Sequence, residues 1–309
     1  MKPVLYLNIP IPAEYMPLLT DAFEVVMATN DAERKQARSR LAEAVAVLTN
    51  GSIGFSPEEI DAAPKLKVLS AYGVGTENLA IDHAKSKGIA VSNGAGSNAV
   101  TVADHALALM LGAFRKVPKF DRVVHDGGWR DGQDLLPILS RKRVGIVGMG
   151  RIGELVAKRV LGFDCEVAYH TRNKRDALPY AYFANVLALA TWCDVLVLAM
   201  PGGPATRHMV NAEVLTALGP KGFLVNVARG SAVDTAALAE ALKNKTIAGA
   251  GLDVYESEPA KPEPLLGFET LVLSPHVAGS SHEAVEGQVT LFIENAQRVF
   301  RGESVTTPV

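Results

Sequence analysis

Short runs of β-forming residues alternate with amphipathic helical segments along most of the chain. This alternation is typical of β–α–β units, in which helices connect the strands of a parallel sheet. In the first third the predicted strands are 4–8, 45–49, 68–72 and 89–93, with helices at 32–43 and 78–87. From residue 143 onward the predicted strands are 144–147, 166–169, 195–199, 223–227, 248–254 and 271–274, with helices at 153–161, 186–190, 211–218 and 235–242. The pattern predicts an α/β protein with two parallel sheets.

The two runs of units predict two lobes with a cleft between them, each Rossmann-like or flavodoxin-like. A chain of 309 residues is long enough for two domains of about 150 residues. We place the first domain at residues 1–97 and the second at 98–282. A last helix, predicted at 283–300, returns to the first lobe, so that residues 283–309 complete it.

The segment 98–115 is predicted to be one long helix that is apolar on nearly all sides. A helix of this kind must be buried, either within one subunit or between two. The polar stretch 118–128 that follows resembles an arm that crosses to another subunit. We therefore favour a subunit interface and expect a homodimer through helix 98–115.

Charge and cysteine content narrow the class of protein. The chain has 31 basic and 33 acidic residues, so it lacks the positive charge that general nucleic-acid binding requires. Cys165 and Cys193 lie in apolar segments without a second cysteine or histidine nearby, which predicts buried, reduced thiols and no metal site. We expect no cleavable leader, and the longest apolar run, 186–200, is too short to cross a membrane. A cytoplasmic protein without a membrane partner is expected.

A glycine motif follows the predicted strand 144–147 and opens the next helix. Its residues are Gly148, Met149, Gly150, Arg151, Ile152 and Gly153. In this context the first glycine permits a tight turn, the second lets backbone approach a pyrophosphate, and the third lets helix pack on strand. The amino end of the helix then attracts the phosphates. The motif predicts a dinucleotide site.

The end of the following strand indicates which dinucleotide is bound. An NAD site usually has an acidic residue there, which binds the ribose 2′-hydroxyl. Here His170, Thr171 and Arg172 follow the strand, and the first carboxylate is Asp176. A guanidinium can bind a 2′-phosphate that a carboxylate would repel. We therefore expect NADP(H) to be preferred over NAD(H).

Three ionisable residues, Arg229, Glu258 and His276, follow later predicted strands. Ligands of open α/β sheets gather at the carboxyl ends of the strands. When hydride adds to a carbonyl carbon, negative charge develops on the oxygen, which a histidine can protonate near neutral pH. A carboxylate would orient that histidine, and a guanidinium would polarise the carbonyl.

With these motifs the chain resembles the D-isomer-specific 2-hydroxyacid dehydrogenases, most of all the glyoxylate/hydroxypyruvate reductases and the hydroxyphenylpyruvate reductases. The runs that carry the resemblance are 148–153, 218–222, 226–230, 249–259 and 274–277. The resemblance implies that Arg229 binds the substrate carboxylate and carbonyl, that His276 transfers the proton, and that Glu258 partners His276. It also implies that Val74 and Gly75 bind the substrate carboxylate through backbone N–H groups. Further cofactor contacts implied in this way are Pro201, Thr206, Val227, Ala228, Asp253, Gly279 and Thr101.

The predicted activity is NADPH-dependent reduction of small 2-oxo acids, foremost glyoxylate and hydroxypyruvate, to D-2-hydroxy acids. Residues 1–97 would bind the substrate and residues 98–282 the dinucleotide. One alternative is reduction of hydroxyphenylpyruvate or another 2-oxo acid, and a more distant one is a non-catalytic, dinucleotide-sensing protein of the corepressor kind. His282 is a rival to His276, and Gly132 stands where some hydroxypyruvate reductases have a second tryptophan after Trp129.

Overall fold

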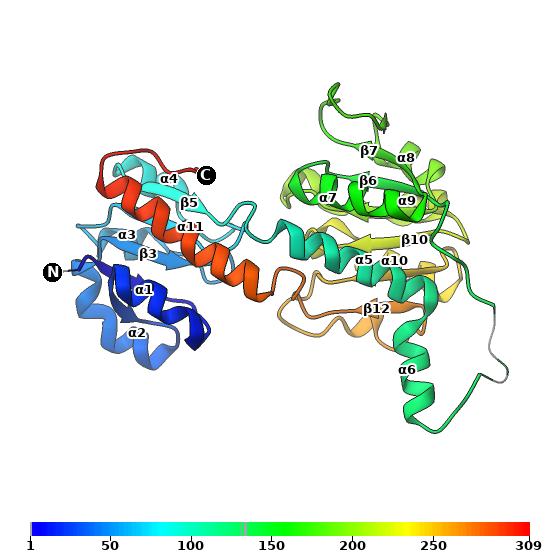
Figure 1. Cartoon of the computed structure of the whole chain (residues 1–309), viewed down its shortest axis with the longest axis horizontal. Helices are drawn as coiled ribbons and strands as arrows, with labels where there is room; N and C mark the ends of the chain where they lie inside the picture. The colour runs from blue at the N-terminus through cyan, green and yellow to red at the C-terminus, as the bar shows by residue number, and fades with distance from the viewer. Residues whose placement is uncertain (1, 131, 133–134) are drawn as a thin grey trace. The chain divides into compact units, whose positions relative to one another are not determined.

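The computed structural model describes residues 2–130, 132 and 135–309, and it divides the chain into two compact units. Unit 1 comprises Met1–Asn98 and Ser280–Val309, with Met1 outside the described residues, and unit 2 comprises Ala99–Gly279 (Figure 1). The sequence placed these boundaries after residues 97 and 282. Each unit is built on a parallel sheet with helices on both faces, as predicted.

Unit 1 contains a five-stranded parallel sheet in the order β2-β1-β3-β4-β5. Its strands are β1 (Val4–Leu7), β2 (Glu24–Met27), β3 (Ala46–Thr49), β4 (Val68–Ala71) and β5 (Ala90–Asn93). Its helices are α1 (Met16–Ala22), α2 (Asp31–Ala37), α3 (Pro57–Asp61), α4 (Ile81–Ser86) and α11 (His282–Phe300). Helices α1 and α11 pack on one face and α2 to α4 on the other. Strand β2 was not predicted from the sequence. It is a short strand at the edge of the sheet, and only its Val26 is fully buried.

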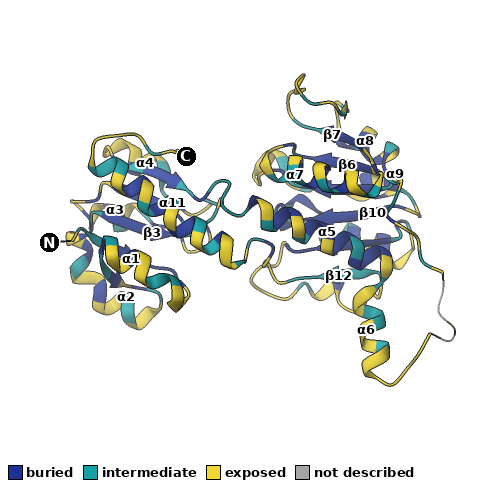
Figure 2. Cartoon of the chain, viewed as in Figure 1, coloured by how far each residue is buried: buried dark blue, intermediate teal, exposed yellow. Residues whose placement is uncertain are grey.

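Unit 2 contains a seven-stranded parallel sheet in the order β12-β11-β10-β9-β6-β7-β8. Its strands are β6 (Arg143–Val147), β7 (Glu166–His170), β8 (Ala181–Tyr182), β9 (Val195–Leu198), β10 (Phe223–Asn226), β11 (Gly249–Leu252) and β12 (Leu271–Leu273). Six strands were predicted here; the seventh, β8, is a two-residue edge strand, too short to produce a sequence pattern. Figure 2 shows that the central strands of both sheets are buried.

The helices of unit 2 complete a doubly wound arrangement. They are α5 (Ala99–Arg115), α6 (Val117–His125), α7 (Arg151–Val160), α8 (Val186–Trp192), α9 (Ala212–Leu218) and α10 (Thr235–Lys243). Helices α5 and α7 share one core with the sheet, and α8 to α10 share the other. The strand order reverses between β9 and β6, and ligands of such sheets bind at this point, beyond the carboxyl ends of the strands.

Helix α5 is buried mostly by its own unit. Its apolar side chains join the core formed with α7 and the sheet, and it approaches β11 so closely that a Cβ on Gly251 would lie 2.9 Å from Leu109 Cβ. The apolar faces of α5, from which the sequence predicts a subunit interface, are therefore largely buried by packing within one chain. The stretch after α5, predicted to be a polar arm, begins with the helix α6.

Both cysteines are buried and unpaired, as the sequence predicted. Burial raises the pKa of the Cys193 thiol to about 12, so this thiol stays protonated and unreactive at neutral pH. Among the described helices, none combines the length and the apolar character needed to cross a membrane.

Candidate active site

Most of the predicted cofactor and catalytic residues lie along one edge of the sheet of unit 2. All pairings in this sheet are parallel, so the carboxyl ends of its strands share an edge. The glycine motif follows β6 and Pro201 follows β9, on either side of the reversal in strand order. Arg229 comes after β10, and His276 comes after β12. The fold therefore gathers residues that are far apart in the sequence.

The glycine motif has the geometry that a pyrophosphate site requires. Gly148 has a φ of +91°, and a Cβ there would lie 2.6 Å from the backbone of Met200. A Cβ on Gly153 would lie 2.1 Å from the carbonyl oxygen of Gly148, so only glycine permits this contact between helix and loop. By contrast, a Cβ on Gly150, the residue before α7, would meet nothing within 4 Å. Gly150 is thus the position where a phosphate can approach the backbone, beside the exposed Arg151 and the half-buried Ile152.

The end of β7 presents cations but no free carboxylate. The Nδ1–H of His170 donates to the carbonyl of Phe183 at 2.9 Å, and the Thr171 hydroxyl donates to the carbonyl of Asn173. Arg172 is exposed, and within the described part of the chain its guanidinium has no hydrogen-bond or ion-pair partner.

The neighbouring cations are already paired. Lys174 lies 2.9 Å from Asp176, and Arg175 binds both Glu154 of α7 and the carbonyl of Met149 in the glycine motif. Arg175 therefore ties the end of β7 to the glycine motif. The sequence showed three cations here, and the structure distinguishes Arg172 as the one that is available to a ligand.

The remaining predicted cofactor residues lie in several places besides Asp253, which directly follows β11. Exposed Pro201 and half-buried Thr206 belong to one loop after β9, which the Thr206 hydroxyl closes by donating to the carbonyl of Gly203 at 3.1 Å. Val227 and Ala228 are buried directly after β10. Gly279 ends unit 2, in the segment after β12 that also carries His276, whereas Thr101 lies in the first turn of α5, ahead of the strands of this unit.

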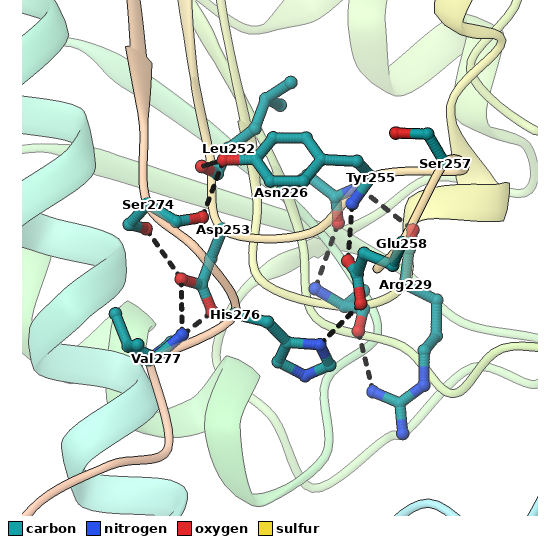
Figure 3. A network of polar contacts seen from close by, with 12 residues as sticks. Asn226, Arg229, Leu252, Asp253, Tyr255, Ser257, Glu258, Ser274, His276 and Val277 are labelled. Atoms are coloured by element: carbon teal, nitrogen blue, oxygen red, sulfur yellow. Dashed lines mark hydrogen bonds and ion pairs between the residues drawn. The ribbon is translucent and has the colours of Figure 1, made fainter. Parts of the chain in front are cut away.

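His276 and Glu258 form an ion pair in unit 2. The distance from His276 Nδ1 to Glu258 Oε2 is 2.7 Å, and the other carboxylate oxygen accepts the backbone N–H of Tyr255 at 2.6 Å (Figure 3). The imidazole Nε2 has no partner among the residues that the structure describes, so it can exchange a proton with a ligand. The backbone of His276 has a φ of +54°. This left-handed conformation is uncommon outside glycine, and where other residues adopt it they are often at functional sites.

The pair shifts the pKa values of both groups. The hydrogen bond with Glu258 raises the pKa of His276, although burial of the ring opposes this. Burial by itself would raise the pKa of Glu258, but the bonds from His276 and the Tyr255 N–H outweigh it and lower that pKa. An imidazolium facing a carboxylate is therefore stabilised near neutral pH, which is the state that a general acid requires.

Arg229 completes the group of catalytic candidates. One of its guanidinium nitrogens donates to the carbonyl of Ala228 at 2.8 Å, and its Cγ would lie 2.7 Å from a Cβ on Gly202. Its charge lowers the pKa of Glu258 and also that of His276, so it lies near both. Buried Asn226 shapes this turn, since its side chain accepts the N–H of Ala228 and donates to the carbonyl of Arg229, each at 3.0 Å. Figure 3 shows Arg229, Glu258 and His276 gathered in one place.

The structure separates the two candidate histidines. His282 begins α11 in unit 1, where its Nδ1 lies 2.9 Å from the hydroxyl of Tyr15 and 3.0 Å from Glu14. His276 lies in unit 2 with Glu258 and Arg229. Of the two, His276 is paired with a carboxylate that also lies near a guanidinium, so we retain it as the candidate acid.

The glycine loop at residues 72–75 lies at the carboxyl edge of the sheet of unit 1, after β4. The carbonyl of Val74 accepts the side chain of Asn93 at 3.0 Å, and the N–H of Gly94 donates to the carbonyl of Gly73 at 2.8 Å. Across the described residues of this unit, the N–H groups of Val74 and Gly75 donate no hydrogen bond. A loop with this geometry can bind a carboxylate through its backbone.

Unit 2 thus has the fold of a dinucleotide-binding oxidoreductase, and the candidate site at the carboxyl edge of its sheet has side chains that suit this class. A model of the family "D-isomer specific 2-hydroxyacid dehydrogenase, NAD binding domain" matches residues 107–278. The chain belongs to this family.

Individual relatives agree with this assignment. The chain is 41% identical over 265 residues to hydroxyphenylpyruvate reductase of Plectranthus scutellarioides, with 85% of each protein covered. It is 36% identical to glyoxylate reductase of Pyrococcus horikoshii, a match that covers 100% of this chain and 96% of the relative. Its structure resembles that of the NADPH-dependent glyoxylate/hydroxypyruvate reductase of Sinorhizobium meliloti in complex with NADP and malonate, with a TM-score of 0.90. The two sequences are 36% identical, and the match covers 100% of this chain and 97% of that one.

Proposed function

We propose that this protein reduces small 2-oxo acids to D-2-hydroxy acids with NADPH, with His276 as the general acid. The observation that carries this proposal is the ion pair of His276 with Glu258, 2.7 Å long, close to Arg229 at the carboxyl edge of a dinucleotide-binding fold. We expect glyoxylate and hydroxypyruvate to be the best substrates, followed by an aryl pyruvate, in line with the relatives of this chain.

The residues of this chain would each perform one part of the reaction. NADPH, when bound, supplies the hydride. The Arg229 guanidinium would hold the 2-oxo acid and stabilise the charge that develops on its carbonyl oxygen. His276 would give that oxygen the proton on Nε2, while Glu258 fixes the orientation of the ring and stabilises its protonated form. We further propose that the N–H groups of Val74 and Gly75 bind the substrate carboxylate.

A substrate panel tests the reaction. Oxidation of NADPH is followed by its absorbance with glyoxylate, hydroxypyruvate, hydroxyphenylpyruvate and pyruvate, and chiral chromatography identifies the product. Turnover of at least one of these acids is expected, to achiral glycolate from glyoxylate and to the D enantiomer of the 2-hydroxy acid from each of the others. Tight binding of NADPH without turnover of any 2-oxo acid would contradict the proposal and favour a dinucleotide sensor.

The preference for NADPH is tested at Arg172, whose exposed guanidinium is proposed to bind the 2′-phosphate. For Arg172→Asp we expect the ratio of kcat/KM for NADPH to that for NADH to fall roughly ten- to a hundredfold, the usual value of a hydrogen bond to a charged group. Arg38→Asp makes the same charge change at an exposed position of unit 1 and serves as the control. An unchanged ratio in Arg172→Asp would exclude this contact.

A homodimer through the outward side of α5 remains our prediction. Val100, Asp104 and Ala108 are exposed one turn apart on this helix, and Val100 is 56% exposed. Sedimentation velocity is expected to give twice the mass of the chain, and Val100→Glu is expected to shift the population toward the monomer because it buries a charge in the interface. A monomeric wild-type protein at micromolar concentration would refute the prediction.

A further inference from the structure

Asp253 holds the loop that carries His276. This residue directly follows β11 and is 1% exposed. Its carboxylate accepts the N–H of Val277 and that of Ala278, each at 2.9 Å, and its backbone carbonyl accepts the N–H of His276 at 2.8 Å (Figure 3). One residue therefore binds three consecutive N–H groups, including that of the left-handed His276.

The same carboxylate accepts a third hydrogen bond, from a side chain. The Ser274 hydroxyl donates to Asp253 Oδ1 at 2.6 Å. Because this hydroxyl has only one hydrogen, its oxygen can act only as an acceptor toward its other neighbour. That neighbour is His105 of α5, whose Nε2 lies 2.7 Å from the Ser274 oxygen and 3.5 Å from Asp253 Oδ1.

These contacts form a chain of donors that runs from α5 to the loop. His105 Nε2–H donates to Ser274, Ser274 donates to Asp253, and Asp253 holds residues 276–278. A carboxylate without the serine donor could rotate about its side chain and weaken its bonds to the two N–H groups. In turn, without His105 the serine hydroxyl could rotate away from the carboxylate.

We propose that His105 and Ser274 are positioning residues for the proton donor, acting through Asp253 on the backbone of His276. This inference rests on the proposed function, in which His276 is the acid. It goes beyond that function because neither residue touches the reacting groups, and because α5, an element on the face of the sheet, takes part in setting the geometry of the acid.

The charged groups that face His276 shift its pKa, so this pKa is a quantity that the test must measure. Glu258 and Asp253 raise the pKa of His276, and Arg229 lowers it. Loosening the loop would weaken the short bond to Glu258, which is the largest contribution that raises this pKa. The pKa of His276 should then move down toward its ordinary value.

The variants are His105→Phe, which removes the donor and keeps a ring, and His105→Gln, which can still donate an N–H. Ser274→Ala removes the middle of the chain, and His125→Gln, on the exposed part of α6, is the control. The pKa of His276 is measured by NMR of its ring, without substrate, and kcat and KM are measured with the best 2-oxo acid against pH.

We expect Ser274→Ala to lower kcat about tenfold, the usual effect of one hydrogen bond to a buried charged group, with little change in KM. His105→Phe loses only the bond to the neutral serine hydroxyl and should lower kcat about three- to tenfold. We also expect both to lower the pKa of His276. His105→Gln should recover most of both properties, and His125→Gln should match the wild type.

Three outcomes are distinguishable. If His105→Phe lowers only the melting temperature and leaves kcat and the pKa of His276 unchanged, the positioning role is wrong. If the ring of His276 shifts as expected in a protein that reduces no 2-oxo acid, the positioning role is retained and the proposed function fails. If His105→Gln is as impaired as His105→Phe in an otherwise folded protein, the role of the donor is refuted.

Discussion

Replacing His276 with asparagine is expected to lower kcat for 2-oxo acid reduction about 10²- to 10⁴-fold, the usual contribution of a general acid. Asparagine is the appropriate replacement because it tolerates the left-handed backbone at this position, where φ is +54°, and cannot donate a proton as an acid does. NADPH binding, measured by fluorescence titration, should persist. His125→Gln is again the control, and a variant with wild-type turnover would show that His276 is not the acid.

The pH dependence of the wild-type enzyme follows from the same pair. Glu258 raises the pKa of His276, so the imidazolium persists to a higher pH than that of an unpaired histidine. Reduction uses the protonated form, so its rate should be constant below this raised pKa and fall as the pH rises through it. Oxidation of the hydroxy acid uses the neutral form and should show the opposite dependence.

The second large effect is expected at Arg229. For Arg229→Gln we predict a fall in kcat/KM of about 10²- to 10³-fold, the value typical of losing one group that stabilises an oxyanion. Arg229→Lys should recover only part of this, because an ammonium keeps the charge but lacks the two parallel donors of a guanidinium.

Arg122→Gln, an exposed change on α6 in the same unit, is the control for Arg229. Steady-state kinetics and NADPH titration together separate lost catalysis from lost cofactor binding. If Arg229→Gln retained wild-type kcat/KM, the charge on the carbonyl oxygen would have to be stabilised by another residue.

Much of this site could be predicted because its residues occupy a position that the fold defines. In a parallel sheet every strand ends at the same edge, so Gly148, Arg172, Arg229 and His276 could be assigned to one region once the strands before them were recognised. The glycine motif could likewise be interpreted because each glycine has a separate steric reason, which the positive φ of Gly148 illustrates.

The parts that could not be predicted depend on contacts between distant side chains. Nothing in the sequence relates His105 to Ser274, which are 169 positions apart, and the resemblance assigned Asp253 only to the cofactor. The pairing of Arg175 with Glu154 was equally hidden, so the sequence could not say which cation near β7 is available. The apolar α5 was ambiguous for the same reason, because periodicity predicts burial but not the partner that provides it.

Isotope transfer tests most directly whether this protein moves hydride from NADPH to a 2-oxo acid. The wild-type protein is incubated with glyoxylate and NADPH that carries deuterium at C4 of the nicotinamide, on each face in turn, and the glycolate is analysed by mass spectrometry. We predict one deuterium on the carbinol carbon for one labelled face only, with the hydroxyl proton coming from solvent. Glycolate without deuterium from either face, or with deuterium from both faces, would contradict stereospecific hydride transfer from the cofactor.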